Sequence, residues 1–350
     1  MRILFVNPRY YLPQLLGGVE TTTFDLVRQL TQMGHTAAVM CQIAKHDALW
    51  VRNRLRSRLT GRAFPADDYR GTRVYRGYQH ASALPEVLAD FRPEVLVVAG
   101  GADWAFELAA ACAATGVRTA FYFHELVALR RLGRPALLDG MRLLANSSYT
   151  AHAVRELIGR EATVIPPLVD RDAYRVESSR RHVTMVNPRR IKGGQVALQL
   201  AQACPDIPFV FREAWHTHDA FVAELRSSAR TLANVTWQPP TQDMLGLYRT
   251  TRILLVPSEW EETWGRVVTE AQASGIPVLA SDYAALPESV GPGGILIPRD
   301  APLTEWAQAL RRMWDDPQVY EELSARALQH SSLPEAQPAA RAAAFIAALQ

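Results

Sequence analysis

The chain has 350 residues, of which 48% are hydrophobic and 21% charged, a composition typical of a globular protein with about two domains. The formal net charge of +3 provides no overall field for nucleic acid, so we expect no nucleic-acid partner. The three cysteines are too scattered for a disulfide framework or a zinc cluster. There is no secretory leader and no run of about 18 apolar residues, which predicts a cytoplasmic protein.

Short apolar runs alternate with helical patterns along the whole chain. In the first half they lie at 3–7, 37–42, 95–100, 119–124, 143–146 and 163–166. In the second half they lie at 183–187, 209–212, 235–238, 253–257, 277–281 and 294–298. Apolar strands separated by helices indicate parallel sheets covered on both faces. Their uneven spacing favours two doubly wound α/β domains over a single eightfold barrel.

The boundary between the domains is predicted near residue 167, because Pro166 and Pro167 end regular structure and a polar stretch follows. We therefore divide the chain into domains at 1–167 and 168–335. Residues 336–350 form an Ala-rich amphipathic helix. Its predicted packing residues are Ala340, Ala344, Ile346 and Leu349, and it could dock back on the first domain.

A strongly basic stretch spans residues 49–62. It carries five arginines, at positions 52, 54, 56, 58 and 62. Val51, Leu55 and Leu59 recur at the spacing of a helical stripe. One interpretation is a solvated helix packed by this stripe. The other is a helix that contacts an anionic membrane or a phosphate-bearing acceptor.

Polar residues follow the predicted strands of the first half, at the edge where open α/β sheets bind ligands. Gly17 and Gly18 come after the first strand and open a helix, which suits either an anion or a tight turn. His124 closes the fourth strand and is either a structural histidine or a residue of the ligand site.

Positive charge collects after the seventh strand. Arg189, Arg190 and Lys192 share a short loop before a helix. Fixed charge and unpaired amides are what a diphosphate requires, although loop charges can also be merely solvated. Lys192 and Lys45 are the only lysines among the 38 basic residues, and the two cations bind phosphate differently.

Carboxylates follow the tenth strand. Glu262 precedes a helix predicted to start near Trp264, and Glu270 lies about two turns further on. Amides near Gly265 suit a phosphate, and a carboxylate deeper in the site can bind both hydroxyls of a ribose. The alternative is a pair of acidic residues stabilised by the helix dipole.

These motifs, in this order, resemble the Glu-x7-Glu signature of retaining GT-B glycosyltransferases, most closely family GT4. The residues that carry the resemblance are Gly17-Gly18-Val19-Glu20, His124, Asn146-Ser147, Lys192-Gly193, Tyr248, Glu262, Glu270 and Pro287-Glu288. The resemblance implies two Rossmann-like domains facing a central cleft. The first would take a glycan, lipid-linked or small-molecule acceptor, and the second a nucleotide-diphosphate sugar, with no metal or other cofactor.

The resemblance also assigns roles to residues of this chain. His124, Lys192 and Glu262 would be catalytic: His124 near the transfer site, Lys192 on the diphosphate and Glu262 on the donor sugar. Glu270 would hold the ribose. The implied donor-binding set is Gly17, Gly18, Arg189, Arg190, Lys192, Glu262, Trp264, Gly265, Arg266 and Glu270.

The sequence departs from the family pattern in places. Val186-Asn187 stands where Gly-Arg is common, so we expect Arg189 or Arg190 to replace the missing phosphate arginine. Trp215 follows the eighth strand and either stacks on the base or packs internally. Two other functions remain open: a nucleotide-sugar epimerase on the same fold, and a non-catalytic subunit that binds a nucleotide sugar.

Overall fold

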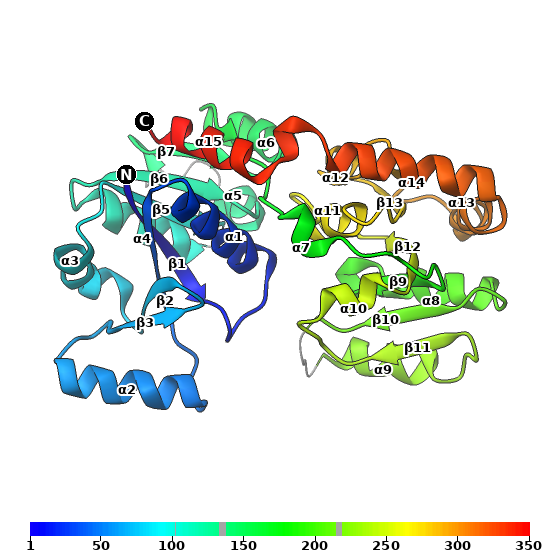
Figure 1. Ribbon diagram of the computed structural model, residues 1–350, viewed down its shortest axis with the longest axis horizontal. Helices are drawn as coiled ribbons and strands as arrows, with labels where there is room; N and C mark the ends of the chain where they lie inside the picture. The colour runs from blue at the N-terminus through cyan, green and yellow to red at the C-terminus, as the bar shows by residue number, and fades with distance from the viewer. Residues whose placement is uncertain (102, 133–137, 215–218) are drawn as a thin grey trace. The chain divides into compact units, whose positions relative to one another are not determined.

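The computed structural model describes residues 1–101, 103–132, 138–214 and 219–350. It divides into two units, one formed by Met1–Leu168 with Pro338–Gln350 and the other by Val169–Gln337. Each unit is built on its own, largely parallel sheet with helices on both faces (Figure 1). The predicted pair of doubly wound α/β domains is therefore confirmed.

The first sheet has, within the described residues, eight strands in the order β3-β4-β2-β1-β5-β6-β7-β8. They are β1 (Arg2–Tyr10), β2 (Thr36–Gln42), β3 (Ala66–Tyr69), β4 (Thr72–Gly77), β5 (Val95–Gly100), β6 (Arg118–Phe123), β7 (Arg142–Ala145) and β8 (Thr163–Val164). Only β3 runs antiparallel, against β4. The connections reverse direction between β1 and β5, so loops from the carboxyl ends of the strands diverge at this point.

Helices of the first unit follow its strands in sequence. They are α1 (Gly18–Gln32), α2 (Ala48–Thr60), α3 (His80–Phe91), α4 (Asp103–Ala113), α5 (Val127–Leu132), α6 (Ser148–Ile158) and the C-terminal α15 (Pro338–Leu349). Ser147 caps α6, accepting a hydrogen bond from the Thr150 amide at 3.0 Å. Serine is a preferred residue at this position because its hydroxyl pairs an amide that the first helical turn leaves without a partner.

The C-terminal helix α15 packs on the first unit, where Phe345 stacks on Phe5 with ring centroids 5.7 Å apart. The predicted packing face was partly wrong, because Ala340 and Ala344 are exposed. The buried side is formed by Arg341, Ala342, Phe345 and Leu349. Alanines surround this helix, so its apolar pattern leaves the face undecided, and the large Phe345 ring determines it.

The second sheet has the order β11-β10-β9-β12-β13-β14 and is parallel throughout. Its strands are β9 (His182–Val186), β10 (Phe209–Arg212), β11 (Val235–Gln238), β12 (Thr251–Val256), β13 (Val278–Asp282) and β14 (Gly294–Pro298). Each predicted strand of the second half is present. Connections reverse between β9 and β12, which places the expected ligand edge at these two strands.

Helices of the second unit cover both faces of this sheet. They are α7 (Arg171–Tyr174), α8 (Gly194–Ala203), α9 (Ala220–Ala229), α10 (Met244–Tyr248), α11 (Arg266–Gln272), α12 (Leu286–Val290), α13 (Leu303–Asp315) and α14 (Pro317–Ser331). Helix α11 begins two residues later than predicted. The reason is that Gly265 precedes it in the left-handed conformation, with φ of 82°.

The basic helix α2 does not pack through its apolar stripe. Val51, Leu55 and Leu59 are 58%, 57% and 77% exposed. The helix is held instead through polar contacts, with Asn53 Nδ2 donating to the Arg76 carbonyl at 3.1 Å. The interpretation of a helix packed by its stripe is therefore wrong. None of the described helices is long and apolar enough to cross a membrane.

Strands β3 and β4 are absent from the sequence prediction, which gave the first half six strands. Charged residues interrupt the apolar pattern of both strands, yet Arg76 in β4 is fully buried. Its Nε donates to Asp67 Oδ2 at 3.0 Å and its Nη2 to the Leu12 carbonyl at 2.6 Å. This ion pair joins β3 to β4 and to the loop after β1, and nothing local in the sequence reveals it.

Replacing Arg76 with methionine leaves the buried Asp67 carboxylate without its closest cation. We expect Arg76→Met to lower the free energy of unfolding by about 3 kcal/mol, measured by urea denaturation. Arg73→Met is the matched control, because Arg73 is 46% exposed and Asp90 keeps Arg62 and the Tyr75 hydroxyl as partners, so the loss is less than about 1 kcal/mol. Equal losses in the two variants would contradict the role of the buried pair.

Candidate functional site

Strands β9 and β12 lie side by side in the middle of the second sheet, and their carboxyl ends point to the same edge. The two strands are parallel neighbours, with Thr184 paired to Leu254. The loops that leave them, at 187–193 and 257–265, therefore emerge side by side. These are the loops that the sequence singled out for positive charge and for carboxylates.

Lys192 and Glu262 meet at this edge. Lys192 Nζ lies 2.6 Å from Glu262 Oε1, and Ser258 Oγ donates to the same oxygen at 3.0 Å. The two charged side chains are 25% and 13% exposed, so the pair is half-buried but reachable from solvent. An ammonium has three donor positions and this contact occupies one of them.

Backbone contacts fix the two loops against each other. The Ile191 carbonyl accepts hydrogen bonds from the amides of Glu259 and Trp260, at 3.0 and 2.8 Å. Gly193 has a φ of 77°, and a Cβ at this position would lie 1.8 Å from the Pro257 carbonyl oxygen. The close approach therefore requires glycine next to Lys192.

Glu270 occupies a buried polar cluster one turn into α11. Arg266 Nε donates to its Oε1 at 2.8 Å, and the Tyr248 hydroxyl donates to its Oε2 at 2.9 Å. Burial and the Glu270 charge raise the pKa of Tyr248 well above its usual value, so the phenol stays a donor. Arg266 also contacts the Tyr174 hydroxyl at 3.4 Å.

Tyr248, Tyr174 and Ser258 are site residues that sequence reasoning did not assign. Tyr248 was noted only as part of the family pattern, and it lies 22 residues from its partner Glu270. Tyr174 reaches Arg266 across 92 residues of chain. Such pairings depend on how the elements pack, so no local signal reports them.

Two predicted donor residues near α11 are mainly packed. Trp264 is 7% exposed, and its Nε1 donates to Thr269 Oγ1 at 2.9 Å, which holds the indole against α11. A Cβ on Gly265 would lie 2.9 Å from Leu286 Cδ2 on α12. Both residues thus shape the loop that presents Glu262.

Arg189 and Arg190 are directed toward the start of α9. Arg189 Nη2 lies 3.2 Å from Asp219 Oδ2. The Arg190 guanidinium lies 4.3 Å from the centre of the Phe221 ring. The assignment of either arginine to a phosphate remains a prediction, and Trp215 lies outside the described residues.

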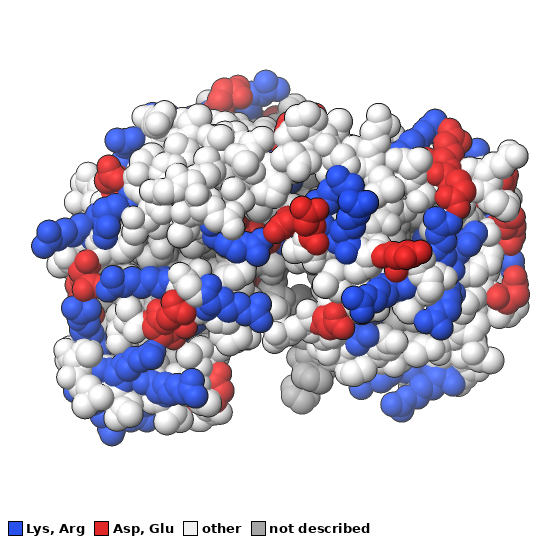
Figure 2. Space-filling view, viewed as in Figure 1, with Lys and Arg blue, Asp and Glu red and all other residues white. Residues whose placement is uncertain are grey.

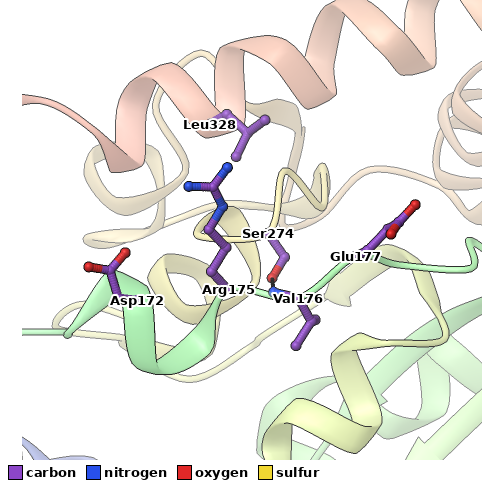
Figure 3. Close-up of a pocket in the computed structure, with 6 residues that line it drawn as sticks. All are labelled: Asp172, Arg175, Val176, Glu177, Ser274 and Leu328. Carbon is purple, nitrogen blue, oxygen red and sulfur yellow. Dashed lines mark hydrogen bonds between the residues drawn. The ribbon is translucent and has the colours of Figure 1, made fainter.

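A separate pocket of about 550 Å³ lies between α7, α11 and α14 of the second unit (Figure 3). The Arg175 side chain extends toward Leu328, and the Asp172 and Glu177 carboxylates lie on opposite sides of it. Ser274 Oγ donates to the Tyr174 carbonyl at 2.8 Å. The pocket contains no predicted site residue, but this bond fixes the segment that carries Tyr174 to the end of α11.

In the first unit, Gly17, Gly18 and His124 share the carboxyl edge of the sheet. A Cβ on Gly17 would lie 2.3 Å from Glu20 Oε2, whereas Gly18 faces open space. The backbone at Gly18 is therefore approachable by a ligand. Glu20 itself is buried, and burial raises the pKa of its carboxyl group.

His124 continues β6, and its amide donates to the Gly100 carbonyl at 3.0 Å. Its ring lies 4.1 Å from the Tyr122 ring, and its Nε2 is inaccessible to solvent. Burial lowers the pKa of His124 to about 3, so the ring is neutral near pH 7. Within the described ranges, no three His, Cys, Asp or Glu side chains gather as a metal site would require.

The contact between Gly193 and Pro257 can be tested by substitution. We expect Gly193→Ala to lower the free energy of unfolding by about 2–4 kcal/mol, because the left-handed φ and the steric clash act together. Gly159→Ala is the matched control: its φ is 73° but nothing lies within 4 Å of the added Cβ, so the cost is about 1 kcal/mol. Equal losses of unfolding free energy in the two variants, measured by thermal or urea unfolding, would contradict a close contact between Gly193 and Pro257.

Comparisons with known proteins agree with this arrangement. Residues 16–173 match the profile of Glycosyltransferase Family 4, and residues 214–316 match that of Glycosyl transferases group 1. D-inositol 3-phosphate glycosyltransferases from Rhodococcus erythropolis and Paenarthrobacter aurescens are 29% and 27% identical to the chain. Each alignment covers 58% of this chain and 53% or 56% of the relative, so the match spans about half the length of these relatives.

Solved structures share the fold at low identity. HepE from Anabaena, in complex with UDP and glucose, superposes with a TM-score of 0.78 and 17% identity, over 100% of this chain and 99% of that one. The two family profiles follow each other along the chain, one for each Rossmann-like unit. The motifs that the sequence analysis singled out lie at the carboxyl edges of the two sheets. The chain belongs to the GT-B glycosyltransferases of family 4.

Proposed function

We propose that the protein is a retaining glycosyltransferase that moves a sugar from a nucleotide-diphosphate sugar to a hydroxyl group of an acceptor. The observation that carries this proposal is the meeting of Lys192 with Glu262 at the β9–β12 edge. It puts a cation and a carboxylate side by side where a diphosphate and a sugar hydroxyl need them.

Each donor residue has a distinct role in this proposal. Lys192 binds the diphosphate with the donor positions that Glu262 leaves available. Glu262 accepts from hydroxyls of the donor sugar, and Glu270 accepts from the ribose. A carboxylate has about four acceptor positions, and Arg266 and Tyr248 take two of those on Glu270, fixing its orientation. HepE was solved with UDP and with UDP-glucose, which favours a uridine nucleotide here.

Departure of the diphosphate requires positive charge. In the absence of a metal, Lys192 supplies it directly, and we assign further charge to Arg189 or Arg190. For Arg189 this means exchanging its contact with Asp219 for a phosphate oxygen. Arg190 already lies over Phe221, which restrains its guanidinium near the same loop.

Transfer is proposed to occur on one face of the sugar. The bond between the anomeric carbon and the phosphate oxygen breaks while the acceptor oxygen bonds to the same face, and the acceptor proton passes to the departing phosphate. The ring of His124 is neutral and its Nε2 is shielded from solvent, so we assign it a positioning role near the transfer site rather than a positive charge. The open backbone at Gly18 leaves room for the reacting groups.

The first test is a donor panel of UDP-, GDP-, ADP- and dTDP-sugars read by thermal shift. We expect a uridine nucleotide to stabilise the protein most, since anything that binds only the folded state raises the melting temperature. Nucleotide release with an acceptor panel then follows turnover. Tight donor binding with no release for any acceptor would instead favour a non-catalytic subunit.

Measuring the affinities of uridine and UDP by calorimetry distinguishes the proposed roles of Lys192 and Glu270. Lys192→Gln is expected to weaken UDP about tenfold and leave uridine unchanged, because only the diphosphate loses its partner. Glu270→Gln should weaken both ligands about tenfold. Tyr248→Phe is the control that keeps the carboxylate but removes one of its donors, and it should have a smaller effect. Unchanged UDP affinity in folded Glu270→Gln would contradict the ribose assignment.

Helix α2 supports a second element of the proposal, peripheral contact with an anionic membrane. Its exposed residues Val51, Leu55 and Leu59 are flanked by arginines. Figure 2 shows Lys and Arg side chains gathered over this part of the first unit. An apolar stripe with basic flanks binds the boundary between lipid headgroups and acyl chains, and lipid-linked acceptors would be presented there.

Vesicle co-sedimentation tests this contact. The triple variant Val51→Ser, Leu55→Ser, Leu59→Ser should bind vesicles of phosphatidylcholine and phosphatidylglycerol at least about tenfold more weakly, because apolar burial is lost. Changing Arg52, Arg54 and Arg58 to glutamine should remove the dependence on salt. Met33→Ser, an exposed apolar site elsewhere on the first unit, is the control. Binding that no α2 variant alters would contradict the proposal.

A further inference from the structure

An open pocket of about 640 Å³ lies in the first unit, at the carboxyl ends of β1, β2 and β4. Tyr10 ends β1, Gln42 ends β2 and Tyr78 directly follows β4. Lys45 and His46 complete the wall. No sequence motif pointed to this pocket, although its place on the sheet edge is where open α/β sheets bind ligands.

The walls of the pocket are held in place before any ligand arrives. The Gln14 side chain bridges from the loop after β1 to the Ala44 backbone, with contacts of 3.1 and 3.0 Å, and to Asp47 Oδ2 at 2.6 Å. Trp50 Nε1 donates to the Tyr78 hydroxyl at 2.5 Å. Fixed walls lower the entropy that a ligand loses on binding.

The chemistry of the pocket is aromatic and cationic. Tyr10 and Tyr78 are 40% and 48% exposed, and such rings suit the faces of a sugar or cyclitol. Lys45 Nζ lies 5.7 Å from the centre of the Tyr78 ring. Across the described part of the chain, no carboxylate forms an ion pair with Lys45. The nearby Asp47 carboxylate instead accepts from the Trp50 amide at 2.7 Å and from Gln14.

Further positive charge adjoins the pocket. Arg54 lies 4.9 Å from the centre of the Trp50 ring, on the first turns of α2. The lysine is therefore oriented by an aromatic ring, has no ion-pair partner among the described residues, and has a second cation, Arg54, on the helix that follows. A compact ammonium in that setting binds a compact, highly charged anion such as a phosphate monoester.

We propose that this pocket binds the acceptor, a phosphorylated polyol, with its phosphate on Lys45 and His46 and its ring against Tyr10 and Tyr78. The inference rests on the proposed function, because it assigns the acceptor of that reaction. Gly17 and Gly18 follow Tyr10 in the same strand-to-helix connection, so the pocket and the open backbone at Gly18 both lie at the carboxyl edge of the first sheet.

Calorimetry on the full chain tests the pocket without requiring turnover. The probes are inorganic phosphate, D-inositol 3-phosphate and unphosphorylated inositol. We expect D-inositol 3-phosphate to bind at least about tenfold more tightly than inositol, since a charge-assisted contact is at stake. Lys45→Gln should remove this preference and leave inositol unchanged, while Lys45→Arg should retain much of it. Arg230→Gln, an exposed cation in the second unit, is the matched control.

Three outcomes would overturn the proposal: neither phosphate probe binds the unaltered protein, Lys45→Gln binds D-inositol 3-phosphate as tightly as Arg230→Gln does, or Lys45→Gln also weakens inositol. UDP is titrated into the same samples. Phosphate binding that depends on Lys45 without any UDP binding would leave the pocket standing and contradict the proposed transferase function.

The phosphate could belong to a free polyol or to a lipid headgroup. Vesicles of phosphatidylcholine with or without a phosphoinositide separate these sources, using the triple α2 variant so that the helix does not dominate binding. Loss of phosphoinositide binding in Lys45→Gln identifies a lipid headgroup. A Lys45 effect seen only with soluble D-inositol 3-phosphate identifies a free polyol.

Discussion

The candidate site depends on one close contact between two loops. Because β9 and β12 are parallel neighbours, their carboxyl ends emerge together. The Ile191 carbonyl accepts hydrogen bonds from the amides of Glu259 and Trp260 and holds the two loops in contact. Gly193 permits it, since a Cβ there would overlap the Pro257 carbonyl. Lys192 and Glu262 meet as a consequence of this backbone geometry.

Buried polar groups stabilise and orient the parts around that contact. Glu270 is enclosed by Arg266 and Tyr248, so its carboxylate has a fixed direction. In the first unit Arg76 plays a comparable structural role, tying β3, β4 and the loop after β1 together. The same loop carries Gln14, which holds the wall of the Lys45 pocket. Removing one partner of such an ion pair lowers the free energy of unfolding strongly, because an uncompensated charge remains buried.

Much of the fold followed from local patterns. Twelve apolar runs correspond to strands, because a strand buried on both faces must be apolar along its length. Strands β3 and β4 were not predicted, because they carry charged residues and the sequence does not show that Arg76 is buried against Asp67. Helix α2 was left with two interpretations, and its exposed stripe became visible only when the polar contact of Asn53 showed which side faces the sheet. Helix α15 was misjudged because alanines leave every side equally apolar.

By itself, the sequence determined most of the strands and helices and the position, at strand ends, of the motifs that resemble family GT4. The elements follow from periodicity and the motifs from short spacings along the chain, whereas the roles of Lys192 and Glu262 rest on the resemblance. Only the tertiary structure decided that Tyr248 orients Glu270, that Arg189 contacts Asp219, and that Lys45 borders an aromatic pocket. These contacts join residues brought together by sheet order and helix packing, and a contact between distant residues leaves no periodic trace in the chain that forms it.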